Sequence, residues 1–274
     1  MVADQALYPS RAALARGLCD VFAWNNPKGD PKLMSARVML LGMERAGLIT
    51  LPAPRSRYTP RKGTALTDRS LPGDPVVGIV DDLSLSFERV ATPDSSRLWN
   101  ELIHRWHYLG YVPLPGAQVR YLVRHRDQVI ACLGFGAAAW KVAPRDCFIG
   151  WSSEARRVNL PRVVNNARFL ILPWVRIPHL ASHLLARAVR HLIADWPPLY
   201  GIAPVLLETF VEASRFRGTC YKAANWIPVG RTQGRGKKDI KNQFLLPVKE
   251  IFLFPLSPRF REILSQDHTP LETP

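Results

Sequence analysis

The clearest pattern in the sequence is a long helical segment between two apolar strands. The segment 180–196, LASHLLARAVRHLIADW, follows a strand-like run at 167–175 and precedes another at 205–211. Upstream, two strand-like runs are joined by the turn-like Arg126-Asp127 and predict a β-hairpin. The other expected elements are a helix at 94–108, hairpin strands at 118–124 and 128–137, a strand at 146–151, a short helix at 215–224, and strands at 226–231 and 251–254. This order predicts an α/β (α+β) fold with a mixed sheet flanked by helices.

The first part of the chain has a different, helical pattern. Ser10 is placed as the N-cap of a helix over 10–22, and a second helix is expected over 32–46, after a turn rich in Asn, Pro and Gly. A short strand at 48–52 completes a small winged-helix-like unit. We therefore expect three parts in the 274 residues: a helical unit at 8–70, an α/β domain at 76–256 and a flexible tail at 257–274.

The charge of the chain predicts its partner. The sequence has 37 Lys and Arg against 22 Asp and Glu, a formal net charge of +15, and a pI of about 10.2. Such an excess attracts polyanions, so double-stranded DNA is the expected partner, with an inert basic surface as the alternative. No apolar run is long enough to cross a bilayer and no signal-peptide pattern is present, so we expect a cytoplasmic protein with no membrane partner.

Several basic or amide side chains are candidates for DNA contact. A proline-rich arm and a glycine-rich loop are suited to follow phosphates, whereas paired Arg and Asn side chains are suited to read base edges. The alternatives are a solvated linker for the arm and turn residues for the Asn pair. The candidates are Arg55, Arg57, Arg61 and Lys62 in the arm, Arg231, Arg235, Lys237 and Lys238 in the loop, and the pairs Arg156-Arg157 and Asn165-Asn166.

The order of elements resembles the GNAT acyltransferase fold, which implies a loop that holds coenzyme A at a helix N-terminus. The matching loop begins at Arg176 and ends at Ala181. Pro178 removes an N–H donor from this loop and His179 replaces a glycine, which argues against coenzyme A. The resemblance also places Tyr221 as the proton donor on the short helix; the alternative is a packed core tyrosine.

The amino-acid sequences of several segments resemble those of the DruA family, which is named from the Druantia anti-phage system and has relatives in mobile elements. The resemblance covers about residues 10–255 and implies a DNA-binding protein of a defence system or mobile element, with other defence or transposition proteins as partners. The segments are His107–Gly110, GAQVRYLV at 116–123, Ile149–Trp151, VVNNARFLILPW at 163–174, LETFV at 207–211 and GTCYKAANW at 218–226.

A further resemblance is to phage Mom proteins, which modify adenine in DNA. It implies a cleft that gathers a base, a proton donor and neighbouring polar groups for modification of a DNA base, with iron as a candidate metal. The residues concerned are His107, Tyr108, Ser182, Glu208 and Tyr221. Alternatives are a non-catalytic DNA-recognition subunit, in which Glu208 is structural, or a two-metal nuclease or transposase using Asp146 and Glu208, for which a third acid is missing.

Overall fold

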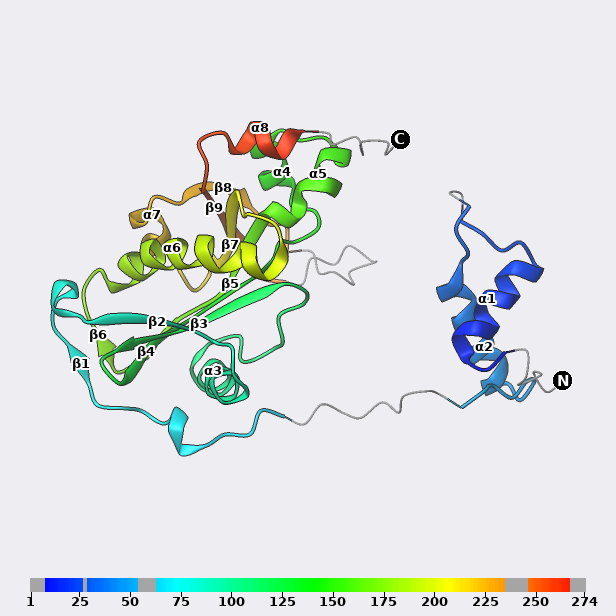
Figure 1. Ribbon diagram of the computed structural model, residues 1–274, viewed down its shortest axis with the longest axis horizontal. Coiled ribbons are helices and arrows are strands. Elements are labelled where there is room, and N and C mark those ends of the chain that lie inside the picture. The colour runs from blue at the N-terminus through cyan, green and yellow to red at the C-terminus, as the bar shows by residue number, and fades with distance from the viewer. Residues whose placement is uncertain (1–7, 27–28, 54–62, 235–245, 267–274) are drawn as a thin grey trace. The chain divides into compact units, whose positions relative to one another are not determined.

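The computed structural model describes residues 8–26, 29–53, 63–234 and 246–266. The chain divides into two compact units, Met1–Gly63 and Thr64–Pro274, which are described separately below (Figure 1). Among the described helices, none combines the length and apolar character needed to cross a membrane.

The first unit is built on two helices, α1 (Arg11–Val21) and α2 (Leu33–Arg45). The Ser10 side chain accepts the N–H of Ala13, which confirms the expected N-cap. The helices pack around a small core that includes Ala15, Cys19, Ala36, Leu40 and Leu51. In the described part of this unit an isolated bridge pairs Asn25 with Pro31, Thr50 is also a bridge residue, and the winged-helix assignment stays a prediction.

The second unit contains a seven-stranded mixed sheet, which confirms the predicted α/β class. Its strand order is β2-β3-β4-β5-β7-β9-β8, and a separate parallel pair joins β1 and β6. The strands are β1 (Val76–Val77), β2 (Leu85–Arg89), β3 (Gln118–His125), β4 (Gln128–Ala137), β5 (Val163–Ile171), β6 (Val175–Arg176), β7 (Leu206–Glu212), β8 (Ile227–Arg231) and β9 (Lys249–Pro255).

Helices flank this sheet. The described ones are α3 (Pro93–Trp106), α4 (Ala143–Ile149), α5 (Ser153–Asn159), α6 (Leu180–Tyr200), α7 (Thr219–Ala223) and α8 (Phe260–Ser265), with short 3-10 turns at Asp68–Ser70, Val80–Asp82 and Leu160–Arg162. The helix α3 begins at a capping box formed by Thr92 and Ser95, and α6 ends where Gly201 takes a left-handed conformation.

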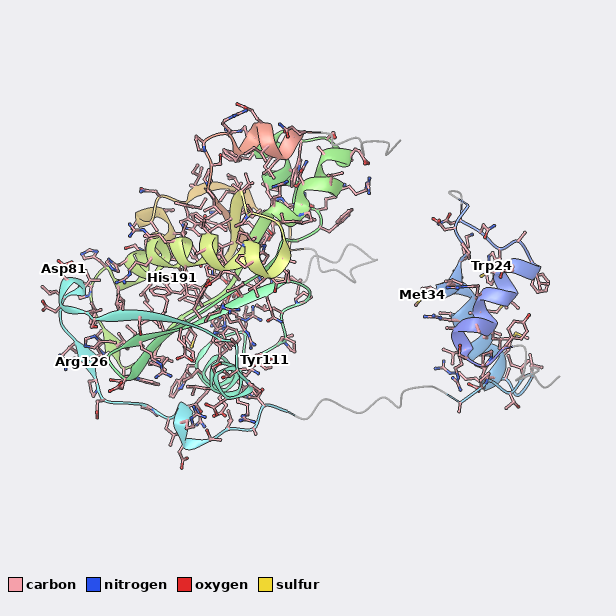
Figure 2. The ribbon with its side chains drawn as sticks, viewed as in Figure 1. Trp24, Met34, Asp81, Tyr111, Arg126 and His191 are labelled. Carbon is pink, nitrogen blue, oxygen red and sulfur yellow. The ribbon has the colours of Figure 1, made fainter. Side chains whose placement is uncertain are left out.

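The helices α3 and α6 cover opposite faces of the first half of the sheet (Figure 1). Side chains of neighbouring residues in β3 point to opposite faces of the sheet. Arg120 donates to Asn100 and Ser96 of α3, whereas Tyr121 donates to Asp195 of α6. His191, labelled in Figure 2, also turns from α6 toward the sheet, where its ring stacks on Phe87 of β2. The sheet is therefore buried on both faces here.

The strands β5 and β7 pair for only part of their length. They are parallel neighbours from Val163↔Leu206 to Asn165↔Glu208, and beyond this point β5 stays paired with β4 while β7 stays paired with β9. The sheet thus opens between the far halves of β5 and β7.

Two predicted elements are wrong. The strand expected at 146–151 is instead the helix α4, because Pro144 favours its first turn, Asp146 accepts the N–H of Val142, and Gly150 ends it in a left-handed conformation. The described part of the predicted tail contains α8, whose Phe260 is buried and stacks on Phe148 of α4. Local helix signals therefore account for α4, and the contact between Phe260 and Phe148 accounts for the ordered position of α8.

Candidate functional site

A cavity of about 560 Å³ lies where β5 and β7 separate. Its walls come from the end of α3, the second half of β5, the middle of β7 and the segment that leads into α7. We call this cavity the cleft. The side chains used below are Trp106, His107, Tyr108, Asn165, Asn166, Arg168, Phe169, Thr209, Phe216, Arg217, Cys220, Tyr221 and Lys249.

A buried hydrogen-bond network joins three sides of the cleft. The Tyr221 hydroxyl donates to Oδ1 of Asn166 at 2.7 Å, and the Thr209 hydroxyl donates to the Asn166 carbonyl at 3.0 Å. The Asn166 amide also donates to carbonyls of Gly134 and Arg168, so its polar groups are fully used. Burial raises the pKa of Tyr221 well above its usual value, so this hydroxyl stays protonated at neutral pH.

His107 lies directly after α3 and contributes a neutral imidazole. Its Nδ1 accepts the N–H of Leu109 at 3.2 Å, so the proton of the neutral ring is assigned to Nε2. Burial, together with the nearby Arg168 charge, lowers the pKa of His107 to about 4. At neutral pH its Nε2 is therefore a hydrogen-bond donor and not a general base.

Tyr108 forms an aromatic wall beside His107. Its ring meets Phe216 edge-on at 5.3 Å, and the Arg215 guanidinium lies over it at 5.2 Å. Burial raises the pKa of Tyr108, so this hydroxyl is also protonated at neutral pH.

Cations line the cleft, and the nearby carboxylate of Glu212, whose charge helps to raise the pKa of Tyr108, pairs with Arg215. Arg168, Arg217 and Lys249 all contribute to the cleft, and none of the described lining residues is Asp or Glu. Within the described part of the chain, the side chains of Arg217 and Lys249 make no ion pair. The cleft is therefore suited to an anionic ligand.

Glu208 does not share the cleft with Tyr221. It lies on the opposite face of β7, where it accepts from Arg145 at 2.8 Å and from the Ala139 N–H at 2.9 Å, and both charged side chains are 0% exposed. Burial raises the pKa of Glu208, and the Arg145 charge opposes that shift. Arg145 also binds Asp146. The prediction that Glu208 and Tyr221 act as base and acid in one cleft is therefore wrong in its placement of Glu208.

Ser182 also lies away from Tyr221's cleft, in a second cavity of about 490 Å³ beside α6. Its hydroxyl donates to the carbonyl of His179 at 3.0 Å. The predicted cofactor loop, from Arg176 to Ala181, leads into this second cavity, which His179 lines.

The cofactor loop does not fit coenzyme A. His179 takes φ 61°, a conformation that favours glycine, so the loop carries an imidazole side chain at the position where the resemblance expects a glycine. Pro178 has no N–H to donate. Among the described residues no group of three or more His, Cys, Asp or Glu side chains is placed to hold a metal, and so residues for iron are not found there.

The predicted DNA contacts fall into three groups. Arg55, Arg57, Arg61, Lys62, Arg235, Lys237 and Lys238 lie outside the described residues. Exposed Arg157 and Arg231 pair with Glu154 and Glu250, whereas Arg156 is mostly buried, binds Asp146 and lies over the Trp140 ring. Asn165 and Asn166 line the cleft, but they are strand residues and not turn residues.

Four residues of the cleft were not predicted from the sequence: Arg168, Thr209, Arg217 and Lys249. The signal for Arg168 and Thr209 was available, because each is a polar residue next to an apolar run within a strand-like segment. Arg217 and Lys249 carry no such local signal. They reach the cleft only because β9 pairs with β7 and the segment before α7 folds over it.

Three acetyltransferases are among the solved structures to which the chain is similar. Aminoglycoside acetyltransferase AAC(6')-Ib in complex with coenzyme A has 14% identity and a TM-score of 0.41, over 63% of this chain and 95% of that one. A spermidine N-acetyltransferase SpeG chimera from Vibrio cholerae and hSSAT has 11% identity and a TM-score of 0.41, over 66% of this chain and 99% of that one. The ribosomal-protein-S18-alanine N-acetyltransferase from Escherichia coli has 9% identity and a TM-score of 0.39, over 63% of this chain and 94% of that one. Likeness at this level carries no argument about activity.

Sequence comparison identifies the family. No curated protein sequence matches the chain. The pattern that defines Druantia protein DruA matches residues 43–246, more than half of the chain, and this span contains the cleft and all the residues that line it except Lys249. The chain belongs to the DruA family.

Proposed function

We propose that this protein binds double-stranded DNA in anti-phage defence and recognises that DNA through the cleft between β5 and β7. The observation that carries the proposal is the lining of the cleft: three cations, several aromatic rings and two amides, with no carboxylate among its described residues. Cations attract phosphates, aromatic rings stack on bases, and amides read base edges.

The charge of the whole chain supports the same proposal. The net charge of +15 gives a long-range attraction for polyanions. Many exposed arginines are already paired, as Arg69 is with Asp94 and Arg259 with Glu262. Arg217 and Lys249, which have no ion pair among the described residues, are therefore the cations of the cleft that are free to meet phosphate.

Recognition is favoured over base modification because the cleft offers no general base among its described residues. Glu208 faces away, His107 donates from Nε2, and Tyr221 is protonated. Base modification is a second candidate, supported by the Tyr221 hydroxyl as a proton donor within the cleft. It would leave a nucleoside of altered mass in DNA from cells that express the protein, whereas recognition leaves the nucleosides unchanged.

The test is DNA binding by the full chain, measured by fluorescence anisotropy with a labelled duplex between about 50 and 200 mM salt. Replacing Arg217 or Lys249 with alanine should weaken binding and reduce the slope of log affinity against log salt by about 1 for each phosphate that the variant no longer neutralises. Arg259→Gln is the matched control, because it removes one exposed cation, directly before α8, that does not line the cleft. An equal loss of affinity in the control, or no duplex binding at all, contradicts the proposal.

A further inference from the structure

We propose that the cleft receives a base turned out of the DNA stack, and that Asn165 and Arg168 hold the edge of this base. The inference rests on the proposed function and adds to it the form of DNA that the cleft takes. It follows from two polar atoms that the fold leaves without partners, from the aromatic walls and from the shape of the site.

The two atoms are Oδ1 of Asn165 and Nε of Arg168. Both are buried and neither has a hydrogen-bond partner, although both residues line the same cavity. One atom is an acceptor and the other a donor. Buried polar atoms without partners are uncommon in folded proteins, and at a cavity they indicate a ligand that supplies the missing groups.

The neighbouring amide shows that such unpartnered atoms are not general along β5. Asn166 is 4% exposed, and its carbonyl oxygen and amide nitrogen are held by Tyr221, Gly134 and Arg168. Asn165 occupies the last position at which β5 pairs with β7, at the point where the cleft begins. Of the two adjacent asparagines, only Asn165 therefore keeps an acceptor available to a ligand.

A nucleobase has the complementary chemistry. Each base edge presents donors and acceptors side by side, which matches an amide oxygen and a guanidinium N–H in one site. Its flat faces stack on aromatic rings, and Trp106, Tyr108, Phe169 and Phe216 supply such rings around the cleft. The planes of the Tyr108 and Phe216 rings are at 61° to each other. A flat base can therefore stack on one of these two rings but not on both.

A base inside a duplex cannot reach these atoms. Groove readout uses a helix or strand that projects into the DNA, whereas here the two residues line a hollow of about 560 Å³. That volume lies within the range of pockets that enclose a small molecule. The base must enter the cleft, and hence leave its stack, while Arg217 and Lys249 neutralise the adjoining phosphates.

The experiment uses the full chain and a duplex that contains one 2-aminopurine, whose fluorescence rises when it leaves the stack. Binding should raise this fluorescence. The duplex with the probe mispaired should bind about tenfold more tightly than the paired one, because a mispaired base costs less to unstack. Asn165→Ala should remove both the fluorescence rise and the preference for the mispaired duplex.

Two further variants keep the test decisive if Asn165→Ala fails to fold. Arg168→Lys keeps the charge but removes Nε, and should reduce the fluorescence rise in the same way. Asn225→Gly is the matched control, because Asn225 lines the second cavity at φ 61°, which glycine adopts without strain. This variant should behave as the unaltered protein.

A free nucleotide offers the same base edge and phosphate, so a competition arm distinguishes the two sources. Excess deoxynucleoside monophosphates should displace little duplex. Full displacement by them overturns the extruded-base inference, as does equal affinity for paired and mispaired duplexes with no fluorescence rise. Those results leave the proposed DNA binding intact, whereas absence of any duplex binding overturns both.

Discussion

Glu208 and Thr209 are neighbours in β7, but their side chains lie on opposite faces of the sheet in contrasting surroundings. On one face, Glu208 meets Arg145, and Asp146, Arg156 and the Trp151 indole complete the network. On the other face, Thr209 lies beside the cleft, whose lining also includes Asn165 and Arg168, two residues with atoms that have no partner.

The difference separates a structural role from a binding role. A buried carboxylate indicates function only where its charge is left available, and Glu208 has its cation and its N–H donor in place. Two residues that line the cleft, Asn165 and Arg168, each have a buried polar atom without a partner, against one such atom, Nε of Arg156, in the Glu208 network, and a ligand in the cleft would supply the missing partners. The number of unfilled hydrogen bonds, more than the presence of an acid, therefore marks the site.

The largest effect is expected from breaking the buried ion pair between Glu208 and Arg145. Arg145→Ala leaves Glu208 buried without its cation and should lower the free energy of unfolding by about 3–5 kcal/mol, measured by chemical denaturation. Arg145→Met combined with Glu208→Leu should recover much of this loss, because it removes both charges together. Loss of DNA binding in Arg145→Ala with unchanged stability would instead assign this ion pair to function.

The sequence predicted the frame of the fold because its strong local signals agree with the tertiary structure. The helix expected at 180–196 is α6, which continues to Tyr200, and the hairpin at 118–137 is β3 and β4 with the expected turn. Both elements combine a clear apolar period with a clear end signal. The segment 146–151 had an apolar run too short to distinguish a strand from a helix.

The site was harder to predict because faces and partners are set at long range. His107, Tyr108 and Tyr221 do meet in one cavity. Glu208 was placed with them, but β7 reads LLETFVE, with apolar residues on both faces, so alternation does not tell which face the acid takes. Its partner Arg145 is 63 residues away in sequence and lies on a helix that the pattern did not predict.

A smaller effect is expected on the cleft face from Tyr221→Phe. The change leaves Oδ1 of buried Asn166 without its donor and should lower the free energy of unfolding by about 1–2 kcal/mol, with nearly unchanged DNA affinity. Tyr200→Phe is the matched control, because the Tyr200 hydroxyl bonds to Gln118 at an exposed site and should cost less. A loss of biological activity in Tyr221→Phe at full DNA affinity would favour base modification.

The smallest effect on the free energy of unfolding is expected from His107, which lines the cleft. Burial lowers its pKa to about 4 in the folded protein, against 6.5 ordinarily. Between these values the unfolded chain binds the proton and the folded chain does not, so the free energy of unfolding falls as pH falls from 6.5 toward 4. With partial solvent access considered, we expect a contribution of about 1 kcal/mol.

His107→Gln isolates this contribution from those of the other histidines, because only the slope that belongs to His107 should disappear. Denaturation of both proteins at several pH values between about 4 and 7 measures the difference. The same pair tests the charge of the cleft: since His107 stays neutral above its lowered pKa, it adds no attraction for phosphate at a pH of about 5.5, and both proteins should gain the same DNA affinity on acidification. A larger gain in the unaltered protein would mean that His107 takes up a proton beside Arg168, and that the cleft is more open to water than its burial implies.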